Sequence, residues 1–148
     1  MSSTTLRFLV EPAHLGPGGR VHGGTVMRWM GEAGFACATH WAEQPCQLVY
    51  TSSIRFRRSV RTDALVEVRA RLAFTGSTNL YVSVELRSGD LATGHTEAVA
   101  ECMAVYIVVG EDGRPMPVKH WTPETPGEMA LASSARAHFQ NTSAAPLE

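Results

Sequence analysis

The sequence predicts an α+β protein in which a curled, antiparallel five-stranded sheet wraps a long central helix, with a further helix at the C-terminus. Two observations indicate this class. The segment "VHGGTVMRWMGEAG" and its continuation, from residue 21 to about residue 42, place apolar side chains at helical spacing. After it, several segments alternate apolar and polar residues and are separated by short turns, which is typical of antiparallel strands.

The N-terminal third begins with a short strand, "TLRFLV" at 5–10, followed by a proline- and glycine-rich loop at 11–20. In the helix that follows, Val26, Met30, Ala33 and Cys37 form one apolar stripe, and further apolar residues extend it nearly all the way round. A helix with this distribution is expected to be buried. We interpret Gly34 as a packing glycine that lets another chain segment approach closely.

Strands are predicted at 46–58, 64–74, 80–88 and 95–110, with a helix over about 126–139. The run from Cys102 to Val109 is wholly apolar, so this strand should be buried on both faces or lie at a subunit contact. One helix cannot cover both faces of such a sheet, so we expect another subunit to pair with it. The chain divides into one domain at 5–120 and a C-terminal helix with a mobile tail at 121–148.

Composition excludes several classes of function. The net charge of −1 argues against general nucleic-acid binding. We see no secretory signal and no membrane span. Three cysteines without metal-ligand spacing indicate reduced thiols, and hence a cytoplasmic protein, and no histidine grouping predicts a metal site.

Four segments together resemble the hotdog-fold acyl-CoA thioesterases of the acyl-CoA hydrolase type. They are "GGRVHGGTVMRWM.EAG" at the helix, "I.F" at 54–56, "VEVRARL.FTG.T" at 66–78 and "DGRPMPV...TPET" at 112–125. The resemblance implies a homodimer, or a trimer of such dimers, that hydrolyses an acyl-CoA. Coenzyme A would enter as part of the substrate, and no cofactor is implied.

Thioester hydrolysis needs a polarised carbonyl and an attacking water or carboxylate. The start of the helix offers free N–H groups and a partial positive charge, so we expect the N–H of Gly24 or Thr25 to bind the carbonyl oxygen. The resemblance also implies a helix carboxylate, acting across the dimer, and a loop asparagine. This chain has Gly31 and Gly16 at those positions. Glu32, the neighbour of Gly31, is then the candidate carboxylate, although one helical residue is a rotation of about 100°.

Other candidates carry alternatives with them. Glu32 could instead pair with Arg28, one turn earlier. His22 either contacts the substrate or orders the loop. Arg57 and Arg58, within a cluster that includes Arg55 and Arg61, could bind phosphate groups or form a solvated charge run. The expected catalytic residues are Gly24 and Glu32, and the expected substrate-binding residues are His22, Gly23, Thr25, Gly31, Arg57, Arg58, Gly76, Ser77 and Thr78.

Three functions fit this pattern to different degrees. The first is a slow or altered acyl-CoA thioesterase. The second is a protein that binds acyl-CoA or an acyl carrier without hydrolysing it. Hydration of an enoyl thioester ranks last, because we find no aspartate–histidine pair for it in the sequence.

Overall fold

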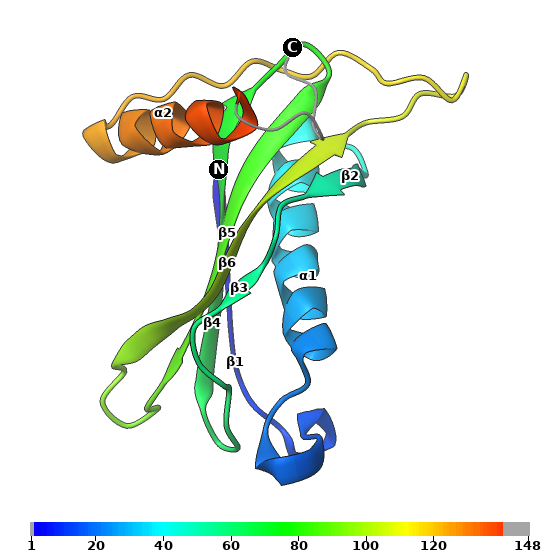
Figure 1. The fold of residues 1–148 in the computed structure, drawn as a ribbon. Coiled ribbons are helices and arrows are strands. Elements are labelled where there is room, and N and C mark those ends of the chain that lie inside the picture. Colours follow the sequence, from blue (N-terminus) through cyan, green and yellow to red (C-terminus); the bar gives the residue numbers. More distant parts are fainter. Residues whose placement is uncertain (1, 141–148) are drawn as a thin grey trace.

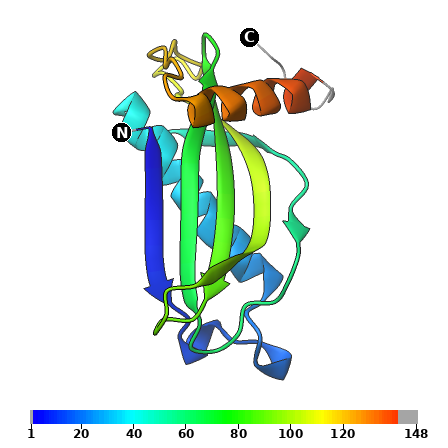
Figure 2. The ribbon, with the colours of Figure 1, turned by 90° about the vertical axis from the view of Figure 1, so that its left-hand side faces the viewer.

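A computed structural model describes residues 2–140, and it places one helix on each face of a single antiparallel sheet (Figures 1 and 2). The strands are β1 (Ser3–Leu9), β2 (Gln47–Thr51), β3 (Arg55–Phe56), β4 (Leu65–Thr75), β5 (Asn79–Gly89) and β6 (Thr96–Ile107). They are ordered β1-β4-β5-β6-β2, with β3 also pairing with β6. The helices are α1 (Gly23–Ala42) and α2 (Pro126–Gln140).

The long strands follow the predicted alternation. Inward residues of β4 and β5 pack in the same core as α1, whereas the residues between them face the other side. Apart from the predicted strand 46–58, strand and helix bounds differ from the expected ones by at most three residues. The core side chains contributed by these two strands are Val66, Val68, Ala70, Leu72, Leu80, Val82, Val84 and Leu86.

In the single chain, helix α1 is buried on one side only, although its apolar residues extend nearly all the way round. Val26, Met30 and Cys37 face the sheet and are almost inaccessible. On the opposite side, Met27 is 48% exposed and Phe35 is 44% exposed. The sheet of a single chain curls past only one side of the helix, so the other apolar side stays uncovered in the single chain.

The predicted strand 46–58 is wrong as one continuous element, and the sheet has six strands rather than five. The chain leaves the ladder after β2, where Ser52 forms two bonds with Met103: its N–H donates to the Met103 carbonyl (2.8 Å), and its Oγ accepts from the Met103 N–H (2.9 Å). Pairing with β6 resumes at β3. This interruption shifts the edge of the sheet and leaves the ring of Phe56 45% exposed.

Helix α2 covers one end of the outer face of the sheet. Phe139 packs on Tyr81, with ring centroids 4.9 Å apart, and shares a small core with Phe74 and Val105. On the other face of β6, Tyr106 packs against α1. The apolar end of β6 is therefore buried on both faces, as expected. The tail at 141–148 lies outside the described residues.

Candidate active site

The start of α1 carries backbone donors that nothing in residues 2–140 uses. His22 is the N-cap residue, and its side chain makes no capping hydrogen bond. Its carbonyl accepts hydrogen bonds from Thr25 N–H (3.0 Å) and Val26 N–H (3.2 Å). The N–H groups of Gly23 and Gly24 have no acceptor within that range, and both residues are exposed. Of the two predicted donors, Thr25 is therefore already bonded and Gly24 is available.

A cavity of about 370 Å³ lies beside this helix end. Its lining includes Gly23, Arg57 and Arg58, so the structure brings together three of the predicted binding residues. The ring of Phe56 also lines it, close to Gly23. The positively polarised N-terminus of α1 and two guanidinium groups thus line one cavity. This arrangement suits a ligand with anionic groups.

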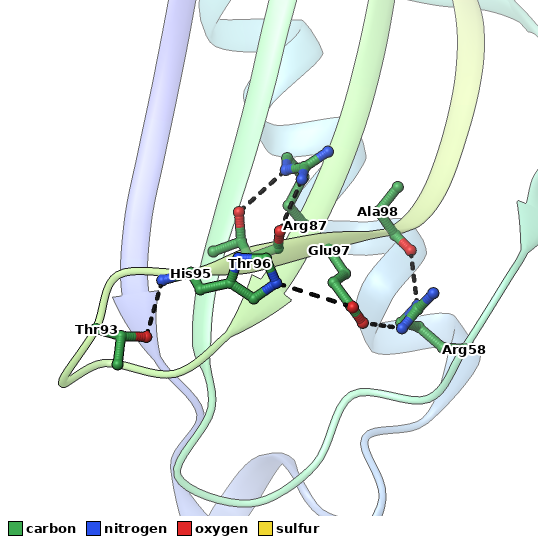
Figure 3. A network of polar contacts seen from close by, with 7 residues as sticks. All are labelled: Arg58, Arg87, Thr93, His95, Thr96, Glu97 and Ala98. Atoms are coloured by element: carbon green, nitrogen blue, oxygen red, sulfur yellow. Dashed lines mark hydrogen bonds and ion pairs between the residues drawn. The ribbon is translucent and has the colours of Figure 1, made fainter.

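The two arginines of the cavity are, however, already paired with carboxylates. Arg57 Nη2 lies 2.5 Å from Glu101 Oε1, and about half of each side chain is exposed. Arg58 pairs with Glu97 and also donates to the Ala98 carbonyl at 3.1 Å, as Figure 3 shows. Exposed ion pairs of this kind are weak, but the two glutamates cancel the charge expected to receive phosphate groups.

The two glycines inside α1 differ in their surroundings. A Cβ atom on Gly34 would overlap the hydroxyl oxygen of Tyr106 and lie 3.2 Å from its Cζ. The same hydroxyl donates a hydrogen bond to the Gly31 carbonyl at 3.3 Å. A Cβ atom on Gly31 would meet nothing within 4 Å. Gly34 is thus required for packing, as expected, whereas Gly31 opens onto free space.

Glu32 is exposed and forms no ion pair with Arg28 among the described residues, so the structural pairing considered for it is absent. Its position along the helix restricts what it can do within one chain. Seven residues separate Gly24 from Gly31, which is about 10 Å along the axis. A carboxylate at 31 or 32 therefore cannot attack a carbonyl held at Gly24 of the same chain.

The loop before α1 is closely coupled to His22. A Cβ atom on Gly16 would overlap the imidazole ring of His22, so this ring fills the space of any side chain at position 16. The loop is fixed by a hydrogen bond from Gly16 N–H to the Arg20 carbonyl at 2.8 Å. A glycine at 16 and the present orientation of His22 therefore depend on each other.

The predicted binding turn Gly76, Ser77 and Thr78 lies far from the start of α1. Val118 N–H donates to the Ser77 carbonyl, and the next residue's carbonyl accepts from Trp41 Nε1 at 2.8 Å. This ties the turn to the C-terminal end of α1, at the top of Figure 1. A helix of 20 residues is about 30 Å long. One chain does not bring the turn and residues 22–25 together.

Other chemistry is limited in the described part of the chain. Burial raises the pKa of the Cys37 thiol to about 11 and raises the pKa of Cys46 and Cys102, so these are poor nucleophiles. No cluster of metal-ligating side chains occurs among residues 2–140. Within the same range, no helix combines the length and apolar character needed to cross a bilayer.

Sequence reasoning missed Tyr106, Phe56 and Arg20 at this site. Tyr106 lies on the inward-facing register of β6, which its alternation with Ala104 signals, but its contact with Gly34 needs the packing of α1. The ring of Phe56 lies beside Gly23, a proximity between residues 33 positions apart that no local pattern indicates. Arg20 sits opposite Arg61 in an isolated antiparallel bridge that no local pattern indicates.

Comparison with known proteins agrees with these observations. Residues 18–95, more than half of the chain, match the model of the thioesterase superfamily. The cytosolic acyl coenzyme A thioester hydrolase of Mus musculus is 27% identical over 141 residues, which cover 93% of this chain but 37% of that protein. This chain therefore spans little more than a third of the length of that relative.

In two further matches, the alignment covers most of this chain and most of the other protein. An acyl-CoA thioester hydrolase of Salmonella typhimurium is 28% identical over 116 residues, covering 76% of this chain and 87% of that protein. The crystal structure of an apo-hexameric acyl-CoA thioesterase superimposes with a TM-score of 0.88 at 28% identity, covering 95% of this chain and 90% of that chain. These matches confirm the predicted fold.

Proposed function

The chain belongs to the thioesterase superfamily, and from this premise we propose that it hydrolyses the thioester of an acyl-CoA to a free acid and coenzyme A. The observation that carries the proposal is the uncapped start of α1, with the Gly24 N–H exposed and without an acceptor in the described residues. The names of the relatives and of the solved neighbour support the same reaction.

In the proposed mechanism, the thioester carbonyl oxygen accepts a hydrogen bond from Gly24 N–H. The helix dipole stabilises the negative charge that develops on this oxygen. A water molecule attacks the carbonyl carbon while Glu32 of a second copy of the chain takes its proton, the carbon–sulfur bond breaks, and the proton passes to the departing thiolate. His22, Gly23 and Thr25 of the first copy and the open space at Gly31 of the second surround the reacting group.

The complete site requires two chains. Glu32 is too far along α1 to act on a carbonyl at its own Gly24, and the turn 76–78 lies at the other end of the helix. A second copy running antiparallel to the first would bring its Glu32 and its turn to this Gly24. We therefore propose a homodimer, or a trimer of such dimers, in keeping with the hexameric solved neighbour.

Apolar surface supports this assembly. Met27 and Phe35 on the outer side of α1 and Leu48, Val49 and Phe56 at the β2–β3 edge are each nearly half exposed in the single chain. Patches of this kind mark protein interfaces. We propose the cytoplasm as the location, coenzyme A as part of the substrate, and no resident cofactor.

Steady-state assays with short, medium, long and aryl acyl-CoAs test the proposal. We expect turnover above the uncatalysed rate but slow, because general acid–base partners typically contribute 10²- to 10⁴-fold and two of the expected ones are glycines. Acyl-CoA binding with turnover no faster than the uncatalysed rate would refute hydrolysis and support the binding-only alternative.

Substitutions at two positions locate the missing carboxylate. Gly31→Asp should raise kcat/KM at least about tenfold, and Gly31→Asn, which has the same shape without the charge, should not. Glu32→Ala should remove most of the residual activity, while Glu32→Asp retains part of it. Equal effects of the aspartate and asparagine variants would contradict a catalytic role for position 31.

A further inference from the structure

Resting on the proposed function, we propose that Arg20 and Arg61 bind the phosphate groups of coenzyme A. The two residues lie directly opposite each other in an antiparallel bridge. The adjacent hydrogen bond from Val21 N–H to the Val60 carbonyl, at 3.0 Å, holds the two segments together. Residues opposite each other in such a bridge project to the same side, so both guanidinium groups extend from one surface.

This pair is electrostatically uncompensated within the described chain. Both side chains are exposed, and no carboxylate of residues 2–140 forms an ion pair with either of them. Asp63, only two residues beyond Arg61, also forms no ion pair with either arginine. Like charges directly opposite each other on paired strands are destabilising. An anionic ligand between them would remove that cost and gain two charge-assisted contacts.

The two arginines that line the cavity are differently placed. Arg57 pairs with Glu101 and Arg58 with Glu97, so a phosphate group there would have to displace or tolerate two carboxylates. Repulsion from those carboxylates opposes an anion, whereas nothing comparable opposes one at Arg20 and Arg61. The assignment of phosphate binding therefore moves from the cavity arginines to this pair.

The location suits the shape of the substrate. Arg20 precedes Gly24 by four residues, so the two lie within about 14 Å of each other even if the chain were fully extended. Val21 and Val60, the next pair along, line the cavity that also contains Gly23, so Arg20 and Arg61 lie at its rim and extend from the other side of the two segments. Coenzyme A carries its thioester at one end of a flexible arm and its phosphates at the other. The arm would leave this cavity at its rim, where the guanidinium forks would hold the phosphates bidentately.

The test compares acyl-CoA with the matching acyl-pantetheine, which has the same thioester and arm but no phosphate. In the double variant Arg20→Gln/Arg61→Gln we expect KM for acyl-CoA to rise about tenfold, because two charge-assisted contacts to the substrate are lost. We expect kcat to stay within about twofold of the wild-type value. KM for acyl-pantetheine should not change. Arg20→Lys/Arg61→Lys should recover part of the loss. Calorimetric binding of coenzyme A should weaken in parallel.

Arg69→Gln/Arg71→Gln is the matched control. These outer-face arginines also lack ion pairs in the described chain, and the variant removes the same net charge. The proposal is overturned if this control raises KM for acyl-CoA equally, if KM rises equally for both substrates, or if coenzyme A binds the glutamine variant as tightly as the wild type. A wild type that binds coenzyme A but hydrolyses neither substrate would refute the proposed function alone, and the binding comparison would still decide this inference.

Discussion

Replacing Gly31 and Gly34 of α1 with alanine, one at a time, distinguishes a glycine required for packing from one that faces open space. Both substitutions should gain about 1 kcal/mol of helix propensity. At Gly34, the new methyl group overlaps the hydroxyl of Tyr106, a side chain that is 2% exposed and has little room to move. At Gly31, the methyl group meets no atom within 4 Å.

The expected changes in the free energy of unfolding therefore differ between the two variants. Forcing a methyl group into a packed core costs about 1–3 kcal/mol, and losing the hydrogen bond from Tyr106 to the Gly31 carbonyl costs about 1 kcal/mol more. Gly34→Ala should therefore lower the free energy of unfolding by about 1–3 kcal/mol. Gly31→Ala should raise it by up to about 1 kcal/mol. Urea denaturation at one fixed protein concentration measures both values, since assembly makes stability concentration-dependent.

A double-mutant cycle with Tyr106→Phe identifies the cause. Phenylalanine lacks the overlapping oxygen, so Gly34→Ala should cost about 1 kcal/mol less in the Tyr106→Phe background. Coupling energies of this size are typical of residues in contact. The reasoning is refuted if Gly34→Ala is as stable as wild type, if Gly31→Ala is the more destabilised variant, or if the cycle shows no coupling.

Three further measurements test other parts of the structure. Phe139→Ala should lower the free energy of unfolding by about 3–5 kcal/mol, because the ring is buried between α2 and the sheet; a loss below 1 kcal/mol in urea titration would argue against docking of α2. Stability should fall as pH rises from 9 towards about 11, because the Cys37 thiol must stay protonated in the folded state and can ionise when unfolded. Cys37→Ala should make this decline shallower, and identical pH profiles would contradict the assignment. Phe35→Glu should convert the oligomer to monomers in sedimentation at micromolar concentration, and an unchanged sedimentation coefficient would show that this side of α1 is not the interface.

The sheet and both helices were predictable because their patterns are local. Alternation along β4 and β5 is typical of strands with one face on a core, and the apolar end of β6 indicated either burial on both faces or a subunit contact. The break between β2 and β3 was not predictable, since it depends on hydrogen bonds between Ser52 and Met103, 51 residues apart.

The site shows the same division. The start of α1 was predictable from adjacent glycines. The pairing of Arg57 and Arg58 was not, because their glutamates are 44 and 39 residues away and meet them only through the register of β6. The sequence predicted Gly34 as a packing glycine, but the side chain that packs on it, Tyr106, could not be predicted. This contact depends on how β6 packs against α1.

The two-turn spacing between Gly24 and position 31 has a genetic consequence. If one groove takes its amide from one chain and its carboxylate from another, defects at opposite ends of α1 complement each other. A chain impaired at position 24, mixed with a chain impaired at position 32, would rebuild one sound groove in each hybrid pair and leave the other doubly defective. Selection on this helix therefore acts on pairs of molecules rather than on single ones.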